Sequence, residues 1–207
     1  MTIAIHPAVP RLPAVDEHVV PEGAGWELLD GERIKIPPSE EPHATQHLDL
    51  GYVLRAHVAE GFTVATDLLT RTSEDTNFAP DVSIYPAARD PLTGGRQLEA
   101  LAFEIVSEQS MAVPTRKAIA LIKRGVRRVF AIKLRKHTQT LLEFDLDANA
   151  WVTLAPSTPI TDPTLALPII VNDLLRAAHA DGAVARALLA REVPEVMVTH
   201  RGAASDR

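Results

Sequence analysis

Short apolar runs alternate along the chain with stretches in which apolar residues recur every three or four positions. Runs of four to eight apolar or β-branched residues are typical of buried strands, whereas the three-to-four-residue period is typical of helices. Because strands both precede and follow the central helix, the order favours an α/β fold with a mixed sheet. The predicted strands are 62–69, 82–85, 101–106, 128–134, 140–144 and 151–154, and the predicted helices are about 42–60, 114–124 and 172–192.

Turn-forming residues mark the boundaries of the first elements. Residues 26–36 place Asp30 and Gly31 between two runs that contain apolar residues, which is a strong signal for a two-residue hairpin turn. Ser39 is a candidate N-cap of the first helix, and Gly61 is its expected end. These signals predict a β-hairpin followed directly by a helix.

The length and the distribution of proline suggest one folded domain with extensions at both ends. A chain of 207 residues fits a single domain at the usual size of roughly 100–200 residues. Residues 1–24 are proline-rich and aperiodic, so we expect a loose arm there. The folded domain is expected at 25–193, followed by a flexible tail at 194–207.

Composition excludes several classes of protein. The chain has no cysteine, which excludes thiol catalysis, iron–sulfur clusters and cysteine zinc sites. No segment approaches the roughly 18 apolar residues of a membrane span. The first twenty residues carry three prolines and one arginine or lysine, Arg11, unlike the start of a signal peptide. We therefore expect a cytoplasmic protein without a membrane partner.

Charge is distributed unevenly along the chain. The formal net charge of −6 argues against a protein that coats nucleic acid without specificity. Residues 105–142 nevertheless contain nine lysines and arginines against one acid, Glu108. Such a basic middle can mark a local anion-binding face, although several separate solvated surfaces would give the same count.

The candidate chemistry lies where acids interrupt apolar segments. Asp81 directly precedes the strand 82–85, and Glu104 stands in the middle of the apolar strand 101–106. A carboxylate is costly to bury there unless it binds a metal or a cation, although a wet sheet face or an arginine partner would also explain it. Lys117 follows near the start of the next helix, where a solvated surface position is the ordinary alternative. Two carboxylates can hold one or two Mg²⁺ ions and an ammonium can orient a water, so this order indicates phosphodiester hydrolysis.

Five segments resemble the Uma-type endonucleases, a branch of the PD-(D/E)XK, restriction-endonuclease-like superfamily. The segments follow the order of that family and cover roughly residues 26–134. Any one of them is weak, but the five together are fairly specific. They are WELLDGE (26–32), PPSEEPHATQHLDLGYVLRAHV (37–58), FAPDVSIY (78–85), FEIVSEQS (103–110) and RKAIALIKRGVRRVFAI (116–132).

The resemblance implies a mixed β-sheet flanked by helices, with Asp81 and Glu104 as metal ligands. It also implies that the backbone carbonyl of Ile105 contacts the metal. In this branch the lysine comes from the following helix, a position that Lys117 matches, and Val106 stands where other branches carry lysine. The helix departs from the family pattern in lacking an acid before the lysine and a common tyrosine later on. These departures leave the proposed ligands intact and concern the residues around them.

Three further residues are candidates for supporting roles. His43 and His47 are four positions apart on a predicted helix, so both imidazoles could face one metal, but no zincin glutamate and no obvious third ligand accompany them. A helix surface or a core hydrogen bond is the ordinary explanation of the pair. The resemblance implies that His43 contacts a phosphate or lies next to the metal ligands. It also implies that Glu27 is an extra metal ligand. The alternative is that Glu27 is an acid on the surface of the hairpin.

These features predict an endonuclease that hydrolyses DNA phosphodiester bonds with Mg²⁺ or Mn²⁺. Asp81 and Glu104 would hold the metal, and Lys117 would position the attacking water. Cutting both strands of a duplex would favour a homodimer with twofold symmetry. The basic residues expected to approach the phosphate backbone are Lys123, Arg124, Arg127 and Arg128.

Two other classes of function fit parts of the same pattern. A non-catalytic module that retains the fold for nucleic-acid or protein binding is favoured by the net acidity and by the altered residues around Lys117. A glycosidase could use Asp81 and Glu104 as its carboxylate pair. Aromatic residues make up only 4% of the chain, which argues weakly against the sugar-binding platforms of a glycosidase.

Overall fold

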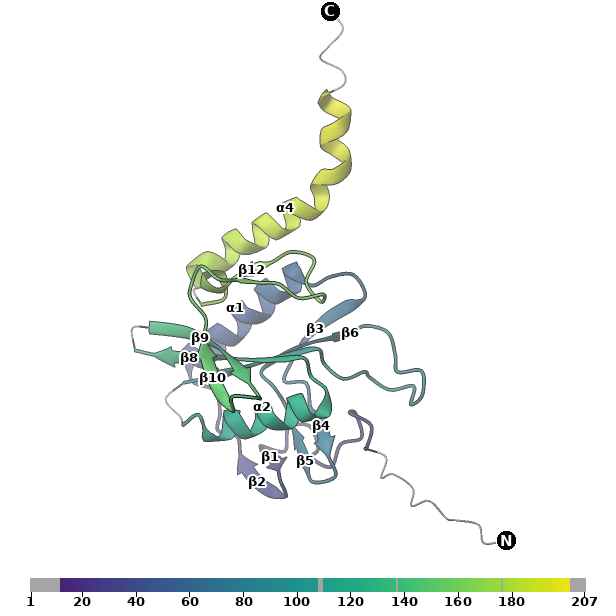
Figure 1. Cartoon of the computed structure of the whole chain (residues 1–207), viewed down its shortest axis with the longest axis vertical. Helices are drawn as coiled ribbons and strands as arrows, with labels where there is room; N and C mark the ends of the chain where they lie inside the picture. Colours follow the sequence, from purple (N-terminus) through teal and green to yellow (C-terminus); the bar gives the residue numbers. More distant parts are fainter. Residues whose placement is uncertain (1–11, 108–109, 137, 176, 202–207) are drawn as a thin grey trace, which may run out of the picture.

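A six-stranded mixed sheet forms the centre of the computed structural model, which describes residues 12–107, 110–136, 138–175 and 177–201 (Figure 1). The strand order is β10-β9-β8-β7-β6-β3, and β7 and β8 run parallel while the other described neighbours are antiparallel. The predicted α/β fold with a mixed sheet is thereby confirmed. The strands are β3 (Phe62–Thr66), β6 (Val82–Pro86), β7 (Leu101–Val106), β8 (Arg128–Arg135), β9 (Thr138–Asp145) and β10 (Ala150–Thr153).

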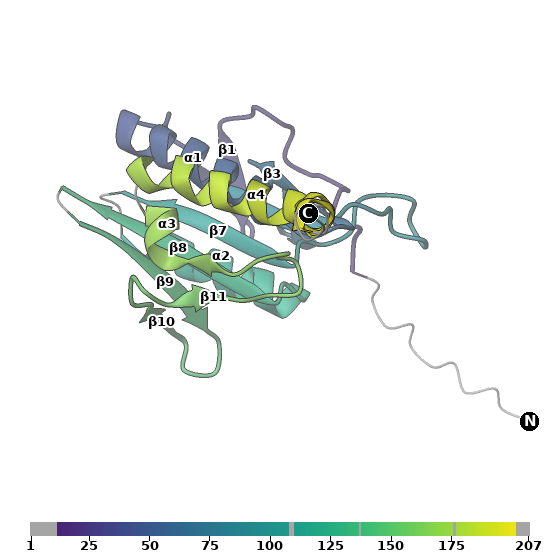
Figure 2. The ribbon, with the colours of Figure 1, turned by 90° about the horizontal axis from the view of Figure 1, so that it is seen from above.

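Helices cover both faces of this sheet. Figure 1 shows α1 and α4 on one side and α2 on the other, and Figure 2 shows α1 and α4 running alongside each other. None of the helices in the described ranges has both the length and the apolar character needed to cross a membrane. The helices are α1 (Glu41–His57), α2 (Ala112–Arg124), α3 (Val171–Leu175) and α4 (Ala177–Arg201).

Alternation along β7 determines which side chains face which helices. Leu101, Phe103 and Ile105 belong to the core that includes α1, α3 and α4, whereas Ala102 packs with residues of α2. Glu104 shares the parity of Ala102 and therefore points to the α2 side. A carboxylate thus enters a strand in which all six residues are buried.

A smaller sheet lies beside α2, with the order β2-β1-β5-β4. Its β1–β2 hairpin has Asp30 and Gly31 at the turn, with φ of 51° and 76°. Two successive positive φ values are the geometry of a type I′ turn, so the predicted hairpin is confirmed. The strands are β1 (Trp26–Leu29), β2 (Glu32–Lys35), β4 (Thr70–Ser73) and β5 (Thr76–Phe78), and a separate pair is formed by β11 (Pro159–Ile160) and β12 (Ile169–Ile170).

The strands β4 and β5 were not predicted, because most of their buried positions are polar. Thr70, Thr72 and Asn77 are all buried, although none is apolar. Asn77 replaces hydrophobic packing with hydrogen bonds, since its Oδ1 accepts the backbone N–H groups of Val19 and Val20. A pattern built on apolar residues cannot detect such strands.

The ends of the domain differ from the expected boundaries. Val15 and Val20 are buried, and the Arg124 guanidinium donates to the carbonyl of Pro13, so residues 12–24 contact the folded body rather than forming a loose arm. Residues 1–11 lie outside the described ranges. At the other end α4 continues to Arg201, through most of the tail expected at 194–207.

The first helix also begins differently from the prediction. It starts at Glu41 with Glu40 at the N-cap position and no side-chain cap hydrogen bond, so the prediction of Ser39 as its N-cap is wrong. Pro42 in the first turn provides the start instead, because proline lacks an N–H and already has a helical φ. The helix ends at His57, and Gly61 forms the following turn with a φ of 83°.

Candidate active site

The pairing of β6 with β7 brings the two predicted acids together. Val82 lies opposite Phe103, so Asp81 stands at the level of Glu104 at the same end of the strand pair. Asp81 Oδ2 accepts the backbone N–H of Ile105 at 2.5 Å. The carboxylate of Asp81 is therefore held against the strand that carries Glu104.

Lys117 reaches the same place from α2. Its Nζ lies 2.7 Å from Glu27 Oε2 and 3.6 Å from Glu104 Oε2, and the lysine is 8% exposed. Asp81, Glu104 and Lys117 line one cavity of about 370 Å³, together with Glu27 and His43. The structure thus brings the three residues predicted for catalysis into one cleft.

Glu27 on β1 is buried rather than a surface acid of the hairpin. One of its oxygens, Oε1, accepts the backbone N–H of Ala79 at 2.9 Å, and the other binds Lys117. The hairpin that carries Glu27 is tied to α2 by Arg116, which forms ion pairs with Asp30 and Glu32. Glu27 therefore orients the ammonium of Lys117 in the cleft.

The electrostatics of this group leave one carboxylate oxygen unsatisfied. Oε1 of Glu104 is buried and has no hydrogen-bond partner among the described residues. Burial raises the pKa of Glu104 to about 8, and the neighbouring Lys117 only partly offsets this effect. Burial lowers the pKa of Lys117, but Glu104 and Glu27 more than compensate, so its pKa stands above the usual value. An orphaned oxygen among acids fits a divalent cation with oxygen ligands.

Two histidines of α1 lie on the other side of Asp81. His43 Nε2 is 3.3 Å from Asp81 Oδ1, and this hydrogen bond raises the pKa of His43 against the effect of burial. His47 Nε2 contacts the backbone carbonyl oxygen of Asp81 and lies 4.0 Å from Asp67 Oδ1. One ligand atom each of His47, Asp67 and Asp81 lies within 4.8 Å of the other two, so these residues could hold a metal ion.

Asp67 was not a candidate from the sequence, because it follows the polar residue Thr66 and so does not interrupt an apolar run. Its place is set by the pairing of β3 with β6, in which Thr66 lies opposite Val82, so that Asp67 and Asp81 face each other. The useful signal would have been this register, since an acid directly after one strand meets an acid directly before its neighbour. In this way Asp67 joins His47 and Asp81 in one group, to which His43 does not belong.

The four basic residues expected to approach DNA do not lie in this cavity. Arg128 begins β8 and is paired with Leu101, at the end of β7 that lies away from Ile105. Lys123 and Arg124 end α2, and Arg127 directly precedes β8. Arg127 and Arg128 form ion pairs with Asp162 and Glu143, respectively. The structure therefore does not bring these four residues together with the acids. The four are Lys123, Arg124, Arg127 and Arg128.

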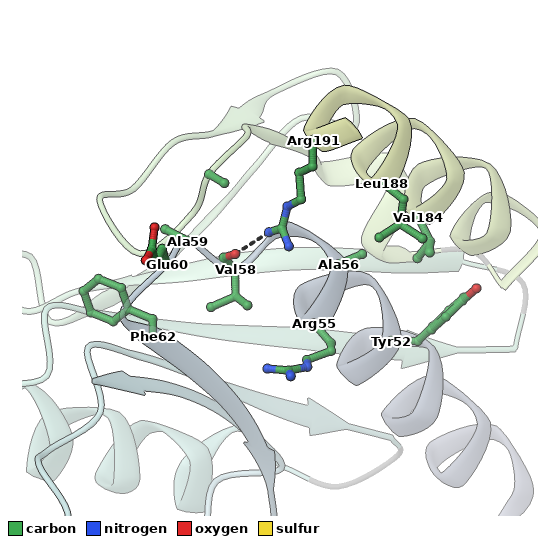
Figure 3. Close-up of a pocket in the computed structure, with 11 residues that line it drawn as sticks. Tyr52, Arg55, Ala56, Val58, Ala59, Glu60, Phe62, Val184, Leu188 and Arg191 are labelled. Carbon is green, nitrogen blue, oxygen red and sulfur yellow. Dashed lines mark hydrogen bonds between the residues drawn. The ribbon is translucent and has the colours of Figure 1, made fainter. Parts of the chain in front are cut away.

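A second hollow, of about 670 Å³, lies between the C-terminal half of α1 and α4 (Figure 3). Tyr52 and Leu188 are among its mainly apolar lining residues. Arg191 points into it and donates to the carbonyl of Val58, and Glu60 is the one carboxylate among the described side chains of its lining. The described lining thus offers no convergent carboxylates for a cation in this hollow. The cavity lined by Asp81 and Glu104 is the candidate site because its acids converge there with Lys117.

Comparison with solved structures shows the same fold in a nuclease-like protein. A crystal structure described as "a putative nuclease belonging to DUF820 from Anabaena variabilis ATCC 29413" has a TM-score of 0.61 with this chain at 19% sequence identity. The similarity covers 75% of this chain and 92% of the other. The chain has no match among curated proteins.

The family is shown by the sequence itself. Residues 11–171 match the Uma2 family, which is described as "Putative restriction endonuclease". This range contains the two acids, the lysine and both histidines of the cleft, and it covers well over half of the 207 residues. The chain belongs to the Uma2 family of restriction-endonuclease-like proteins.

Proposed function

We propose that this protein is an endonuclease that hydrolyses phosphodiester bonds of DNA with Mg²⁺ or Mn²⁺. The observation that carries the proposal is the convergence of Asp81, Glu104 and Lys117 in one cavity, where an oxygen of Glu104 has no hydrogen-bond partner within the described ranges. The family and the fold support a nuclease, and the donor set supports the metal.

The carboxylates of Asp81 and Glu104, with the carbonyl of Ile105, would hold the cation. A divalent cation there would polarise the scissile phosphate and lower the pKa of a bound water. The N–H of Ile105 binds Asp81 Oδ2 and keeps this carboxylate in place.

Lys117 would act on the attacking water and on the negative charge that develops at phosphorus. Glu27 holds Nζ at 2.7 Å, so the ammonium is fixed before the substrate arrives. Fixed charges of this kind lower the barrier because they need no reorganisation during the reaction. His43, whose raised pKa favours the imidazolium, would contact a phosphate oxygen at the rim. For duplex DNA, a twofold dimer would present one such site to each strand.

A non-catalytic module that binds nucleic acid or protein is the second candidate, and one observation favours its protein-binding form. Arg127 and Arg128 are engaged in ion pairs with acids of the same chain, which leaves fewer free cations for the DNA backbone than the sequence suggested. Such a module would have the same fold but would not hydrolyse DNA.

Divalent-dependent nicking of plasmid DNA separates the two candidates. We expect Asp81→Asn to lose metal binding and cleavage together, because it removes a ligand charge. Lys117→Ala should keep metal binding and lose roughly 10²–10³-fold in rate, as is typical for one positioned group. The exposed Asp147→Asn and Lys136→Ala are matched controls that should cut like the wild type.

Equal nicking by all of these proteins would point to a contaminating nuclease and refute the assignment. Metal binding without nicking by the wild type would favour the binding module. Thermal melting of each variant shows whether a loss of activity reflects a loss of folding.

A further inference from the structure

Three cations of β8 and the turn after it lie at the end of the sheet that carries the candidate active site. Because β7 and β8 are parallel, their register places Glu104 opposite Ala131 and Val106 opposite Lys133. Lys133 therefore stands two residues beyond the level of Glu104. Figure 2 shows the β8–β9 hairpin extending from the end of the sheet at which α1 begins, and the first turn of α1 carries His43 of the cavity. The three cations are Lys133, Arg135 and Lys136.

Two of these cations are on the face of the sheet that carries Glu104. Opposite residues of neighbouring strands share a face, so Ala131 is on the face of Glu104, and Lys133 and Arg135 follow on that face because side chains alternate. Ala131 itself is buried with Val106. Along this face, β8 thus passes from a buried alanine to the half-buried Lys133 and then to the exposed Arg135.

The partner strand adds hydroxyl groups to the same face. Thr140 of β9 is opposite Lys133, and Thr138 is opposite Arg135. Residues 129–142 contain no aspartate or glutamate. Cations and hydroxyls without acids are the side chains that typically bind phosphate oxygens of a nucleic-acid backbone. We call this surface the basic hairpin, defined by Lys133, Arg135, Lys136, Thr138 and Thr140.

The other cations in the basic middle of the chain are engaged elsewhere or lie far from the cleft. Four of them form ion pairs with acids of the same chain: Arg116, Lys117, Arg127 and Arg128. Arg124 donates to the carbonyl of Pro13, and Lys123 is in the last turn of α2, away from the turn that lines the cavity. Within the described ranges no ion pair engages the three cations of the basic hairpin, so their charge is available to a ligand.

We propose that the basic hairpin binds the phosphate backbone of duplex DNA beside the cleft. The inference rests on the proposed function, which brings a phosphodiester to Glu104. At roughly 3.3 Å per residue, Lys133 and Arg135 stand about 7 and 13 Å beyond the level of Glu104 along the strand. Both distances are well below one turn of the duplex, about 34 Å, so the hairpin contacts phosphates that flank the scissile bond.

Fluorescence anisotropy of two unrelated labelled duplexes tests this surface in the full-length chain, with Ca²⁺ in place of Mg²⁺ to separate binding from hydrolysis. We expect the double variant Lys133→Ala with Arg135→Ala to flatten the plot of log affinity against log salt by about two phosphate contacts, at roughly 0.9 per contact. Adding Lys136→Ala should remove about one more. The change should be the same for both duplexes, because phosphate contacts do not read sequence.

Arg89→Ala with Lys123→Ala is the matched control, since it removes the same charge from exposed positions at the opposite end of the sheet. We expect its slope to stay within about one contact of the wild type. Lys133→Arg with Arg135→Lys keeps both charges and should also retain the slope. Thermal melting checks the fold of each variant. An unchanged slope in Lys133→Ala with Arg135→Ala, an equal change in the control, or a loss in the charge-preserving variant would overturn the proposal.

Plasmid nicking with Mg²⁺ separates this proposal from the endonuclease. A wild type that nicks DNA, together with a double variant whose slope is unchanged, would refute the basic hairpin and retain the endonuclease. A wild type that binds DNA through the hairpin without nicking it would support the hairpin and refute the endonuclease. No binding of either duplex by the wild type at about 50 mM salt, where electrostatic contacts are strong, would overturn the role of the hairpin.

Discussion

Two buried ion pairs of this molecule differ in how completely their polar atoms are hydrogen-bonded. Arg96 Nη1 lies 3.0 Å from Glu99 Oε2, and Thr70 donates to the other oxygen, Oε1, at 2.7 Å. Lys117 lies 3.6 Å from Glu104 Oε2, and Glu104 Oε1 has no partner in the described part of the chain. Both carboxylates are more than nine-tenths buried.

The difference separates a structural pair from the pair that we propose to be functional. Arg96 also donates to Thr70 and to the carbonyl of Leu69, so its cluster ties the loop before β7 to the start of β4. When every polar atom has a partner, hydrogen bonds and ion pairing largely offset the cost of desolvation. For Glu104, part of the free-energy cost of desolvation is not offset, and a bound cation could offset it. Burial of a charge alone therefore does not mark a site. The carboxylate oxygen of Glu104, which has no partner in the described part of the chain, is what distinguishes this pair from that of Arg96 and Glu99.

The largest effect on folding is expected at the satisfied pair. Arg96→Met should lower the free energy of unfolding by about 3–5 kcal/mol, because it leaves Glu99 charged and buried without its partner. Glu104→Gln should change this free energy little or raise it, since Lys117 keeps Glu27 at 2.7 Å. Urea unfolding at pH 7 compares the two variants. If Glu104→Gln were as destabilising as Arg96→Met, the distinction between the pairs would fail.

An intermediate effect is expected in the pH dependence of stability. The pKa of Glu104 rises from 4.5 to about 8 on folding, so the folded chain holds this proton more tightly than the unfolded chain. The resulting stabilisation is fully present below pH 4.5 and is lost as the pH rises through about 8. Between these values the wild type should lose stability relative to Glu104→Gln, as measured by urea unfolding in EDTA. A difference between the two proteins that is independent of pH would contradict the raised pKa.

The smallest effect is expected at the surface arginines. Arg127 and Arg128 already pair with Asp162 and Glu143, so we expect them to contribute little to DNA binding. The double variant Arg127→Ala with Arg128→Ala should leave the salt dependence of DNA affinity nearly unchanged, within about one phosphate contact on a slope of roughly −0.9 per phosphate. Fluorescence anisotropy with a labelled duplex at several salt concentrations measures this slope. If the slope changed by the equivalent of two phosphate contacts, these arginines would leave their acidic partners and bind DNA instead.

The sequence predicted the parts of the site that local patterns encode. An acid inside a fully apolar run located Glu104 on a buried strand, and the dipeptide at the hairpin located the strand that carries Glu27. It could not predict Asp67, whose role depends on the register of two strands. It also missed the pair of Arg96 and Glu99, which lies in a loop without periodicity and is formed by tertiary contacts. Local chemistry is readable from the sequence, whereas partners brought together by the sheet are not.

Anomalous diffraction from crystals soaked in Mn²⁺ tests the central claim most directly. The account predicts a Mn²⁺ peak within bonding distance of carboxylate oxygens of both Asp81 and Glu104, with Lys117 Nζ still held by Glu27. A structure in which Mn²⁺ binds elsewhere, while Glu104 remains bound to Lys117 alone, would contradict it.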